Sequence, residues 1–251
     1  KLRLQMGVTS FMLLTLSFAT TVLAQVSITQ PGVPFTQNFE NFDGLADPVH
    51  WVTSDAPGAA ASVWLGQNDG GSTTGGKWSY GQDASADRAL GFLPSSTRAI
   101  YADISFINNT GDEITSLAVS YAGEHWRSAF NGRNNGWAVS YKIGDGDFVD
   151  VPQLTYIAPN NKPNGALNGN LPENRELLNF TIPSLSIPNG ASFVLRFFGD
   201  NGTGGGSRQA VAFDDFSLTV STDAPTQVAA PTFDPPAGTY FSPQNVAITT
   251  V

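Results

Sequence analysis

Val211-Ala-Phe-Asp-Asp-Phe-Ser-Leu-Thr-Val220 contains two apolar alternations that are one residue out of phase. Val211 and Phe213 alternate as residues of a half-buried β-strand do, and a second alternation begins at Phe216. Successive side chains of a strand point to opposite faces, so both sets can face one core only if the strand slips by a residue, usually at a β-bulge. The sequence therefore predicts a closing strand with a bulge at Asp214-Asp215.

The two adjacent carboxylates need a compensating group, because burying an unpaired carboxylate is costly. Calcium is suited to this role, since it takes six to eight oxygen ligands. We expect a structural Ca²⁺ held by Asp214 and Asp215 together with Glu40 and Asp43 of the first strand. The alternative is that one aspartate caps a turn and the other pairs with an arginine such as Arg196.

The same period of two recurs along the chain between turns rich in Gly, Pro and Asn. The clearest predicted strands are 35–42, 100–106, 114–121, 137–141, 178–182 and 193–198. An Asp87–Arg88 pair is expected to fix a turn over residues 87–91, and residues 158–174 are expected to form a long loop. No segment longer than two turns has a helical period, so we predict an all-β, jelly-roll-like antiparallel β-sandwich.

Composition narrows the class of partner. The formal net charge is −9, and such an acidic surface repels nucleic acid and anionic membranes. There is no Cys, which excludes a disulfide framework and a thiolate metal site. Charged residues are 13% of the chain whereas Gly numbers 26 and Pro 16, as is typical of a β protein with many turns.

The two ends predict a secreted, multidomain protein. Residues 1–24 begin with Lys1 and Arg3, continue apolar and end in Val22-Leu-Ala24, as a signal peptide does, so we expect an extracellular chain with no membrane association after cleavage. The sandwich is expected over 25–220 and a Ser/Thr/Pro/Ala linker over 221–230. Residues 231–251 would begin an incomplete second β-sandwich, with further C-terminal domains as partners.

Two parts of the chain resemble known families. Ile107-Asn-Asn-Thr-Gly111, the segment from Leu117 to Arg127, Gly165-Ala-Leu-Asn-Gly-Asn170 and the closing strand are together similar to the N-terminal jelly-roll module of large secreted bacterial proteins, including extracellular nucleases and phosphoesterases. The resemblance covers about residues 35–220 and implies no catalysis, with an ion often held between the first and last strands. Residues 231–248 resemble the start of the chitobiase/β-hexosaminidase C-terminal-like sandwich.

Glu124-His-Trp-Arg127 is the most reactive-looking cluster, because a Glu and a His can do acid–base chemistry. We expect instead that Glu124 pairs with Arg127 and that Trp126 packs on the sheet. An enzyme would need a pocket converging on Glu124 and His125 with shifted pKa values. His50 is the only other histidine, and neither His lies in the context of a catalytic triad.

The tryptophan residues point to an alternative function in binding. Sugars stack on exposed aromatic faces, and Trp64 and Trp78 flank the Gly-rich loop at residues 66–76. If they are exposed they would bind polysaccharide or a cell-surface glycan; otherwise they fill the core, as strand phase predicts for Trp137. The sequence thus predicts a non-catalytic accessory or adhesion module with a structural calcium, or alternatively a carbohydrate-binding module that targets an attached hydrolase.

Overall fold

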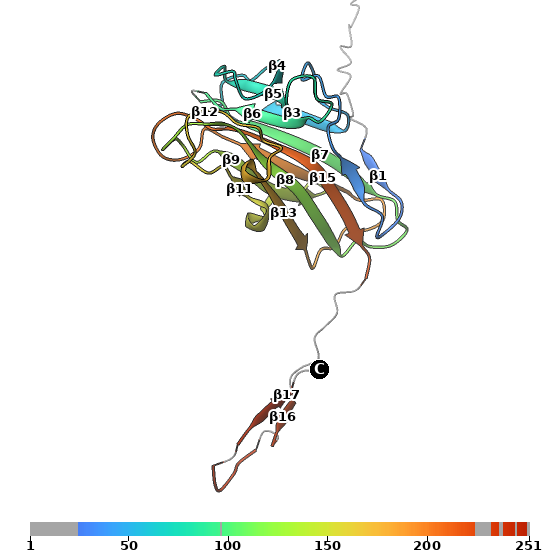
Figure 1. Cartoon of the computed structure of the whole chain (residues 1–251). Coiled ribbons are helices and arrows are strands. Elements are labelled where there is room, and N and C mark those ends of the chain that lie inside the picture. The colour runs from blue at the N-terminus through green and yellow to red at the C-terminus, as the bar shows by residue number, and fades with distance from the viewer. Residues whose placement is uncertain (1–24, 96, 224–231, 236–237, 244, 250–251) are drawn as a thin grey trace, which may run out of the picture.

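The alternating sequence folds into two β-sheets packed face to face (Figure 1). The computed structural model describes residues 25–95, 97–223, 232–235, 238–243 and 245–249. Within those residues there is no α-helix, and two short 3₁₀ helices, η1 (Pro152–Leu154) and η2 (Pro172–Asn174), lie in connections. The predicted all-β sandwich is confirmed.

The seven-stranded sheet has β7, β14 and β9 at its centre, all antiparallel to their neighbours there. Its strands are β1 (Val26–Ile28), β3 (Trp51–Asp55), β7 (Ile100–Asn108), β9 (Gly136–Ile143), β10 (Val149–Asp150), β11 (Tyr156–Ile157) and β14 (Ser192–Gly199). β1, a short strand that the sequence pattern did not predict, pairs with β7 in parallel.

The eight-stranded sheet is organised around β15, which pairs with β8 along one edge and with β6 and β2 along the other. Its strands are β2 (Phe35–Gln37), β4 (Trp64–Asn68), β5 (Gly76–Tyr80), β6 (Ala89–Leu93), β8 (Ser116–Ser128), β12 (Gly165–Ala166), β13 (Arg175–Ile182) and β15 (Ala210–Ser221). β16 (Thr232–Asp234) and β17 (Ala247–Thr249) form a separate antiparallel pair.

β15 contains the predicted bulge. Its register against β8 shifts between Asp214 and Ser217, and Asp215 has a φ of 49°, in the left-handed region. Phe213 and Phe216 are three residues apart, yet both are fully buried in the core between the sheets. An odd separation can place two side chains on one face only when the strand slips, so the bulge lets both halves of β15 contribute to the core.

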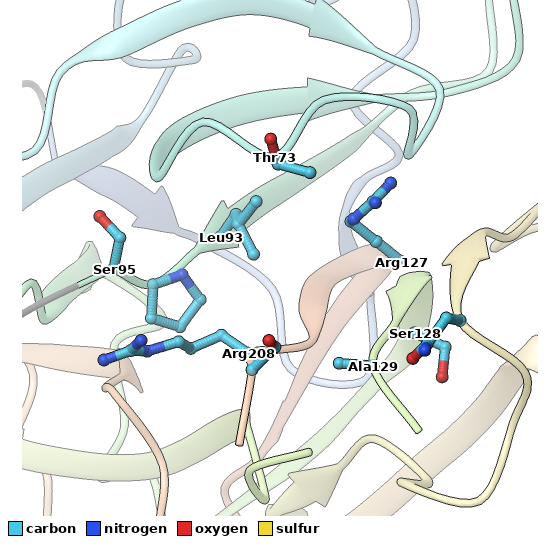
Figure 2. Close-up of a pocket in the computed structure, with 10 residues that line it drawn as sticks. Thr73, Leu93, Ser95, Arg127, Ser128, Ala129 and Arg208 are labelled. Carbon is cyan, nitrogen blue, oxygen red and sulfur yellow. The ribbon is translucent and has the colours of Figure 1, made fainter. Parts of the chain in front are cut away.

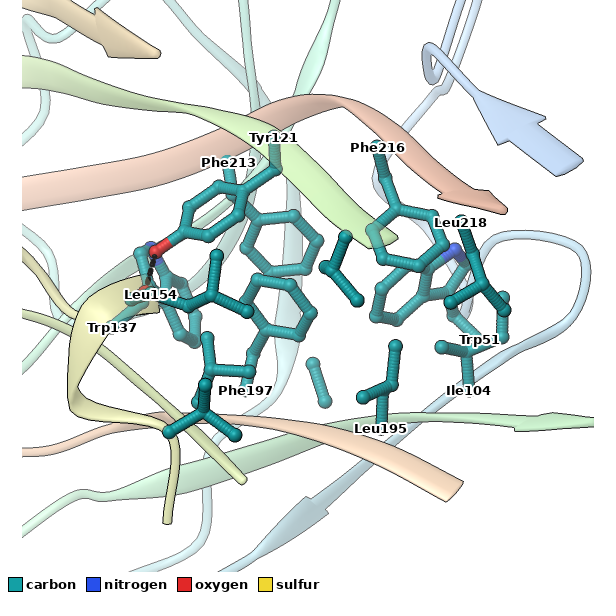
Figure 3. Close-up of a cluster of buried hydrophobic side chains, with 14 of the residues drawn as sticks. Trp51, Ile104, Tyr121, Trp137, Leu154, Leu195, Phe197, Phe213, Phe216 and Leu218 are labelled. Carbon is teal, nitrogen blue, oxygen red and sulfur yellow. Dashed lines mark hydrogen bonds between the residues drawn. The ribbon is translucent and has the colours of Figure 1, made fainter. Parts of the chain in front are cut away.

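The core is aromatic (Figure 3). Phe213 of one sheet stacks on Phe197 of the other, with ring centroids 4.3 Å apart and planes at 20°. Trp51 and Trp137 contact the same Phe213 ring at 5.1 Å each, and Trp137 is buried as predicted. Burying such rings stabilises a sandwich that has no disulfide.

A second apolar cluster covers the outer face of the eight-stranded sheet over β5, β6 and the adjoining ends of β8 and β15. The ring of Trp126 stacks on Tyr80 with centroids 5.7 Å apart and planes at 18°. The same cluster contains three small strand residues: Ala89, Ala210 and Ala212. The expectation that Trp126 packs on the sheet is confirmed, and both faces of this part of the sheet are buried.

Three local predictions are corrected. The first strand ends at Gln37 rather than at residue 42, because Phe39 and Asn41 have positive φ values of 50° and 59° that no extended strand accommodates. The turn expected over residues 87–91 is wrong from residue 89 onward, because Ala89–Leu93 form β6. In place of an Asp87–Arg88 pair, Asp87 Oδ2 accepts from Asn170 and Arg88 donates to Gln67.

Other predictions fall partly outside this structure. The signal peptide at 1–24 and residues 224–230 of the linker lie outside the described residues. Among the described residues, no helix is long and apolar enough to cross a membrane.

Candidate functional site

The structure brings the predicted first strand, now β2, next to the closing strand β15, as the calcium prediction requires. β2 pairs with β15 antiparallel, with Gln37 opposite Phe216. Glu40 follows β2 in an exposed turn. Asp43 is also exposed, and its Oδ1 accepts a hydrogen bond from the backbone N–H of Leu45 at 2.9 Å.

Asp214 and Asp215 meet different environments. Asp214 is 3% exposed, and its Oδ1 has no hydrogen-bond partner among the described residues. Burial first, and then the nearby charge of Glu124, raises the pKa of Asp214 to about 9. Asp215 is exposed and forms an ion pair with Arg175, so an aspartate does pair with an arginine, but not with Arg196, which pairs with Asp103.

The described part of the chain contains no group of three or more His, Cys, Asp or Glu side chains arranged to hold a metal ion. The four residues Glu40, Asp43, Asp214 and Asp215 therefore do not converge here as a ready ligand set. One of them already has a cationic partner in Arg175. The buried, unpartnered Oδ1 of Asp214 is the one feature that fits a cation, and calcium stays a prediction.

Glu124 is anchored within the fold rather than aimed into a pocket. It is 1% exposed; its Oε2 accepts from Trp126 Nε1 at 2.8 Å and its Oε1 from Arg175 Nε at 3.3 Å. Burial raises its pKa to about 7. The predicted Glu124–Arg127 pair is wrong, because Arg127 Nη1 donates to the carbonyl oxygen of Gly70 instead.

His125 is separated from Glu124 by strand geometry. Adjacent residues of β8 point to opposite faces, so the two side chains do not converge. His125 is fully buried, with Nε2 against the carbonyl of Arg127 at 2.9 Å and Gln209 Oε1 at 3.1 Å. Burial lowers its pKa to about 4. The pKa shifts of Glu124 and His125 therefore result from burial among structural contacts, and the two side chains do not share a cleft.

The two tryptophans proposed for ligand binding are engaged in packing. Trp78 is 8% exposed, and its Nε1 donates to the carbonyl of Thr74 at 3.0 Å, so the expected exposure is wrong for Trp78. Trp64 is half-buried; its Nε1 donates to Asp47 at 2.7 Å and its ring packs edge-on against Phe42 at 5.0 Å.

The outer face of the seven-stranded sheet carries a shallow pocket of about 200 Å³, here called the sheet-face pocket. Three aromatic side chains line it: Tyr101 of β7, Phe198 of β14 and Phe148, just before β10. Strand register sets Tyr101 opposite Phe198, and their ring centroids lie 5.3 Å apart. The rings are half-buried, so they are held in place with part of their surface open.

Arg196 fixes these rings. Its Nε and Nη2 donate to the two carboxylate oxygens of Asp103, each at 2.8 Å. Its guanidinium carbon lies 3.8 Å from the ring centroids of both Tyr101 and Phe148, which are favourable cation–π contacts. Asp150 adds a carboxylate to the lining. The pocket thus combines aromatic surface with polar groups held in fixed positions.

A second pocket of about 420 Å³, here called the strand-end pocket, lies where β6, β8 and β15 meet their loops (Figure 2). Leu93 ends β6, Arg127 lies near the end of β8, and Arg208 precedes β15. Figure 2 shows the guanidinium groups of Arg127 and Arg208 on either side of Leu93.

Neither pocket was predicted from the sequence. For the sheet-face pocket the signal was present in β14, where Leu195 and Phe197 alternate with Arg196 and Phe198. Arg196 and Phe198 therefore lie on the face turned away from the core, where they line the pocket. For the strand-end pocket no pattern existed, because its residues come from strand ends and loops far apart in sequence.

No protein-family profile and no curated protein matches the sequence. Solved structures that resemble it include TmCBM61 in complex with β-1,4-galactotriose (13% identity, 74% of this chain and 99% of that chain, TM-score 0.37). Others are the K3 cleaved adhesin domain of Lys-gingipain from Porphyromonas gingivalis w83 (16%, 74% and 98%, 0.41) and a cyclase from Fischerella sp. TAU (12%, 76% and 100%, 0.42). At these identities the likeness extends to the β-sandwich fold alone.

Proposed function

We propose that this β-sandwich is a non-catalytic binding module of a secreted protein and that it binds carbohydrate in the sheet-face pocket. The observation that carries the proposal is the set of three aromatic rings, Tyr101, Phe148 and Phe198, around one pocket on an open sheet face. The C–H groups on one side of a pyranose ring pack on such rings, while its hydroxyl groups hydrogen-bond to neighbouring polar side chains.

The polar groups match a neutral, hydroxyl-rich ligand. Arg196 supplies donors and Asp150 supplies acceptors within the same pocket. Because Arg196 is already held by Asp103 and by two rings, its ordering costs little on binding. A volume of about 200 Å³ lies below the usual range of small-ligand sites, so the pocket would hold a single sugar ring of a longer chain that lies across the sheet.

The placement of the two most reactive-looking residues supports a role without catalysis. Glu124 and His125 lie on opposite faces of β8, and neither lines the sheet-face or the strand-end pocket. Their pKa shifts follow from burial among structural partners.

The proposal is tested by affinity electrophoresis of the protein in gels containing soluble xylan, galactan or hydroxyethyl cellulose. We expect at least one of these neutral polysaccharides to retard the protein. Phe148→Ala and Phe198→Ala should each lose most of the retardation, whereas Leu177→Ala, an exposed substitution on β13 of the other sheet, should not. Thermal unfolding verifies that each variant is folded. The proposal fails if none of the polysaccharides retards the protein, or if the two Phe variants are retarded like the wild type.

A structural calcium is a second part of the proposal, favoured by the unpartnered Oδ1 of Asp214. Because the four carboxylates do not converge in this structure, the ion would have to draw Glu40, Asp43 and Asp215 towards Asp214, and the β2–β15 pairing keeps the two strands adjacent for this. Ca²⁺ that binds only the folded state must raise the unfolding temperature relative to excess chelator, and Asp214→Asn should abolish the rise. An unchanged midpoint would remove calcium and leave the sugar-binding proposal standing.

A further inference from the structure

The strand-end pocket differs from the rest of the surface in charge. The protein carries a formal net charge of −9, yet the residues lining this pocket include Arg127 and Arg208 and no Asp or Glu. Neither arginine takes part in the three ion pairs found among the described residues, which use Arg175 and Arg196. The pocket is therefore a local positive site on an acidic protein.

Both guanidinium groups are held in place with donors to spare. Nη1 of Arg127 donates to the carbonyl oxygens of Gly70 and Gly71 at 2.9 and 3.2 Å, and Nε of Arg208 donates to Asn201 Oδ1 at 2.7 Å. Among the described residues no acceptor is bonded to Nε or Nη2 of Arg127, nor to either Nη of Arg208. A positioned guanidinium with free N–H groups suits bidentate binding of a carboxylate.

The surroundings of the two arginines suit a sugar ring. Leu93 and Pro94 are themselves buried and give the pocket an apolar floor, and the exposed hydroxyl groups of Thr73 and Ser207 add donors and acceptors at the rim. The volume of about 420 Å³ falls within the range of sites for small ligands. A nucleic acid, by contrast, would bring a dense row of phosphates against a protein whose overall charge repels it.

We infer that the strand-end pocket binds an acidic oligosaccharide, such as a chain of uronic acids, and that Arg127 and Arg208 bind its carboxylates on the two sides of Leu93. The inference rests on the proposed carbohydrate-binding function but places its charge recognition in a different pocket. The sheet-face pocket would hold a neutral part of the glycan, and the strand-end pocket would select chains that carry a carboxylate.

The test compares trigalacturonate with its fully methyl-esterified form by isothermal titration calorimetry on the full chain. The two probes share rings and linkages and differ in charge, so the ester should bind at least about tenfold more weakly, the loss of one charge-assisted contact. Arg127→Gln and Arg208→Gln should each weaken trigalacturonate binding by about the same factor, and added salt should weaken it further.

Arg133→Gln is the matched control, because Arg133 lies outside the lining and donates to the carbonyl of Gly202 at the same end of the sandwich. It should bind like the wild type. Equal affinity for acid and ester, no binding of trigalacturonate at millimolar concentration, or equally tight binding of inorganic sulfate or phosphate would each overturn the inference. Phe148→Ala separates the two proposals, because it should lose binding to neutral polysaccharide while Arg208→Gln retains it.

Discussion

Asp214 and Asp215 project from the same face of the eight-stranded sheet, but only one of them has a cationic partner. Phe213 before them and Phe216 after them both point into the core, so the bulge leaves both carboxylates on the outer side. Asp215 reaches Arg175, whereas Asp214 is buried with an unpartnered oxygen beside the charge of Glu124. The same slip that completes the core therefore isolates one carboxylate.

The isolation of Asp214 predicts a pH-dependent stability in metal-free buffer. The pKa values of Asp214 and Glu124 are raised to about 9 and about 7, so the folded state holds these protons more tightly than the unfolded chain. Their contribution to stability is complete below about pH 4 and is lost as pH rises through 7 and 9. His125, with its pKa lowered to about 4, acts below about pH 6.5 and in the opposite direction.

Between pH 6.5 and 9 the thermal midpoint in excess chelator should therefore fall. Asp214→Asn cannot lose a proton in this range, so its midpoint should fall much less. Asp215→Asn, the exposed neighbour, should retain most of the wild-type slope, because burial and the charge of Glu124 raise the pKa of Asp214 more than the charge of Asp215 does. A wild-type midpoint that rises across this range, or an Asp214→Asn variant with an unchanged slope, would contradict the assignment of the effect to Asp214.

The aromatic core predicts which single truncation is most damaging. Phe213 stacks on Phe197 and contacts Trp51 and Trp137, so Phe213→Ala leaves a cavity lined by rings of both sheets. Urea unfolding should show a loss of about 3–5 kcal/mol. Leu177→Ala, at a site 64% exposed, should change stability by no more than about 0.5 kcal/mol. Comparable losses at the two sites would contradict the placement of Phe213 at the centre of the core.

Period-two alternation was enough to predict the sandwich, because strands such as β7 and β14 bury one face and expose the other residue by residue. It failed for β5 and β6, where every residue is buried. With the second apolar cluster over its outer face, that part of the sheet has no polar side to reveal a period, so Trp78 was expected at the surface and residues 87–91 in a turn.

Side-chain partners were harder to predict than strands. Arg175 lies 40 residues from Asp215, and only the pairing of β13 and β15 with opposite edges of β8 brings the two together. The sheet-face pocket likewise needs the register of β7, β14 and β9 to gather Tyr101, Arg196 and Phe148. Single-sequence patterns specify a face of one strand and say nothing of which strands adjoin it.

Two glycines with nearly equal φ angles allow the cost of a steric clash to be measured apart from the cost of a positive φ. Gly66 has φ +93° and open space where a Cβ would lie, whereas a Cβ at Gly70, φ +91°, would lie 2.0 Å from the carbonyl oxygen of Trp126. Both Ala variants should lose about 1–3 kcal/mol for the positive φ. Gly70→Ala should lose clearly more, because backbone must move. Equal unfolding free energies for the two variants would contradict the close approach of residue 70 to β8.

Removal of the hydroxyl group should affect stability in opposite ways at two buried tyrosines. Tyr121 Oη donates to the carbonyl oxygen of Leu154 at 2.5 Å, which ties β8 to η1 (Figure 3), whereas the hydroxyl of Tyr80 is buried without a partner among the described residues. Tyr121→Phe should cost about 1 kcal/mol, because the carbonyl loses its donor inside the core. Tyr80→Phe should be neutral or stabilising, because it removes a polar atom that burial leaves unsatisfied. Urea unfolding of the two variants measures this difference directly, with the same atom deleted in each case. A larger loss at Tyr80 than at Tyr121 would mean that the Tyr80 hydroxyl has a partner, such as a bound water, beneath the ring of Trp126.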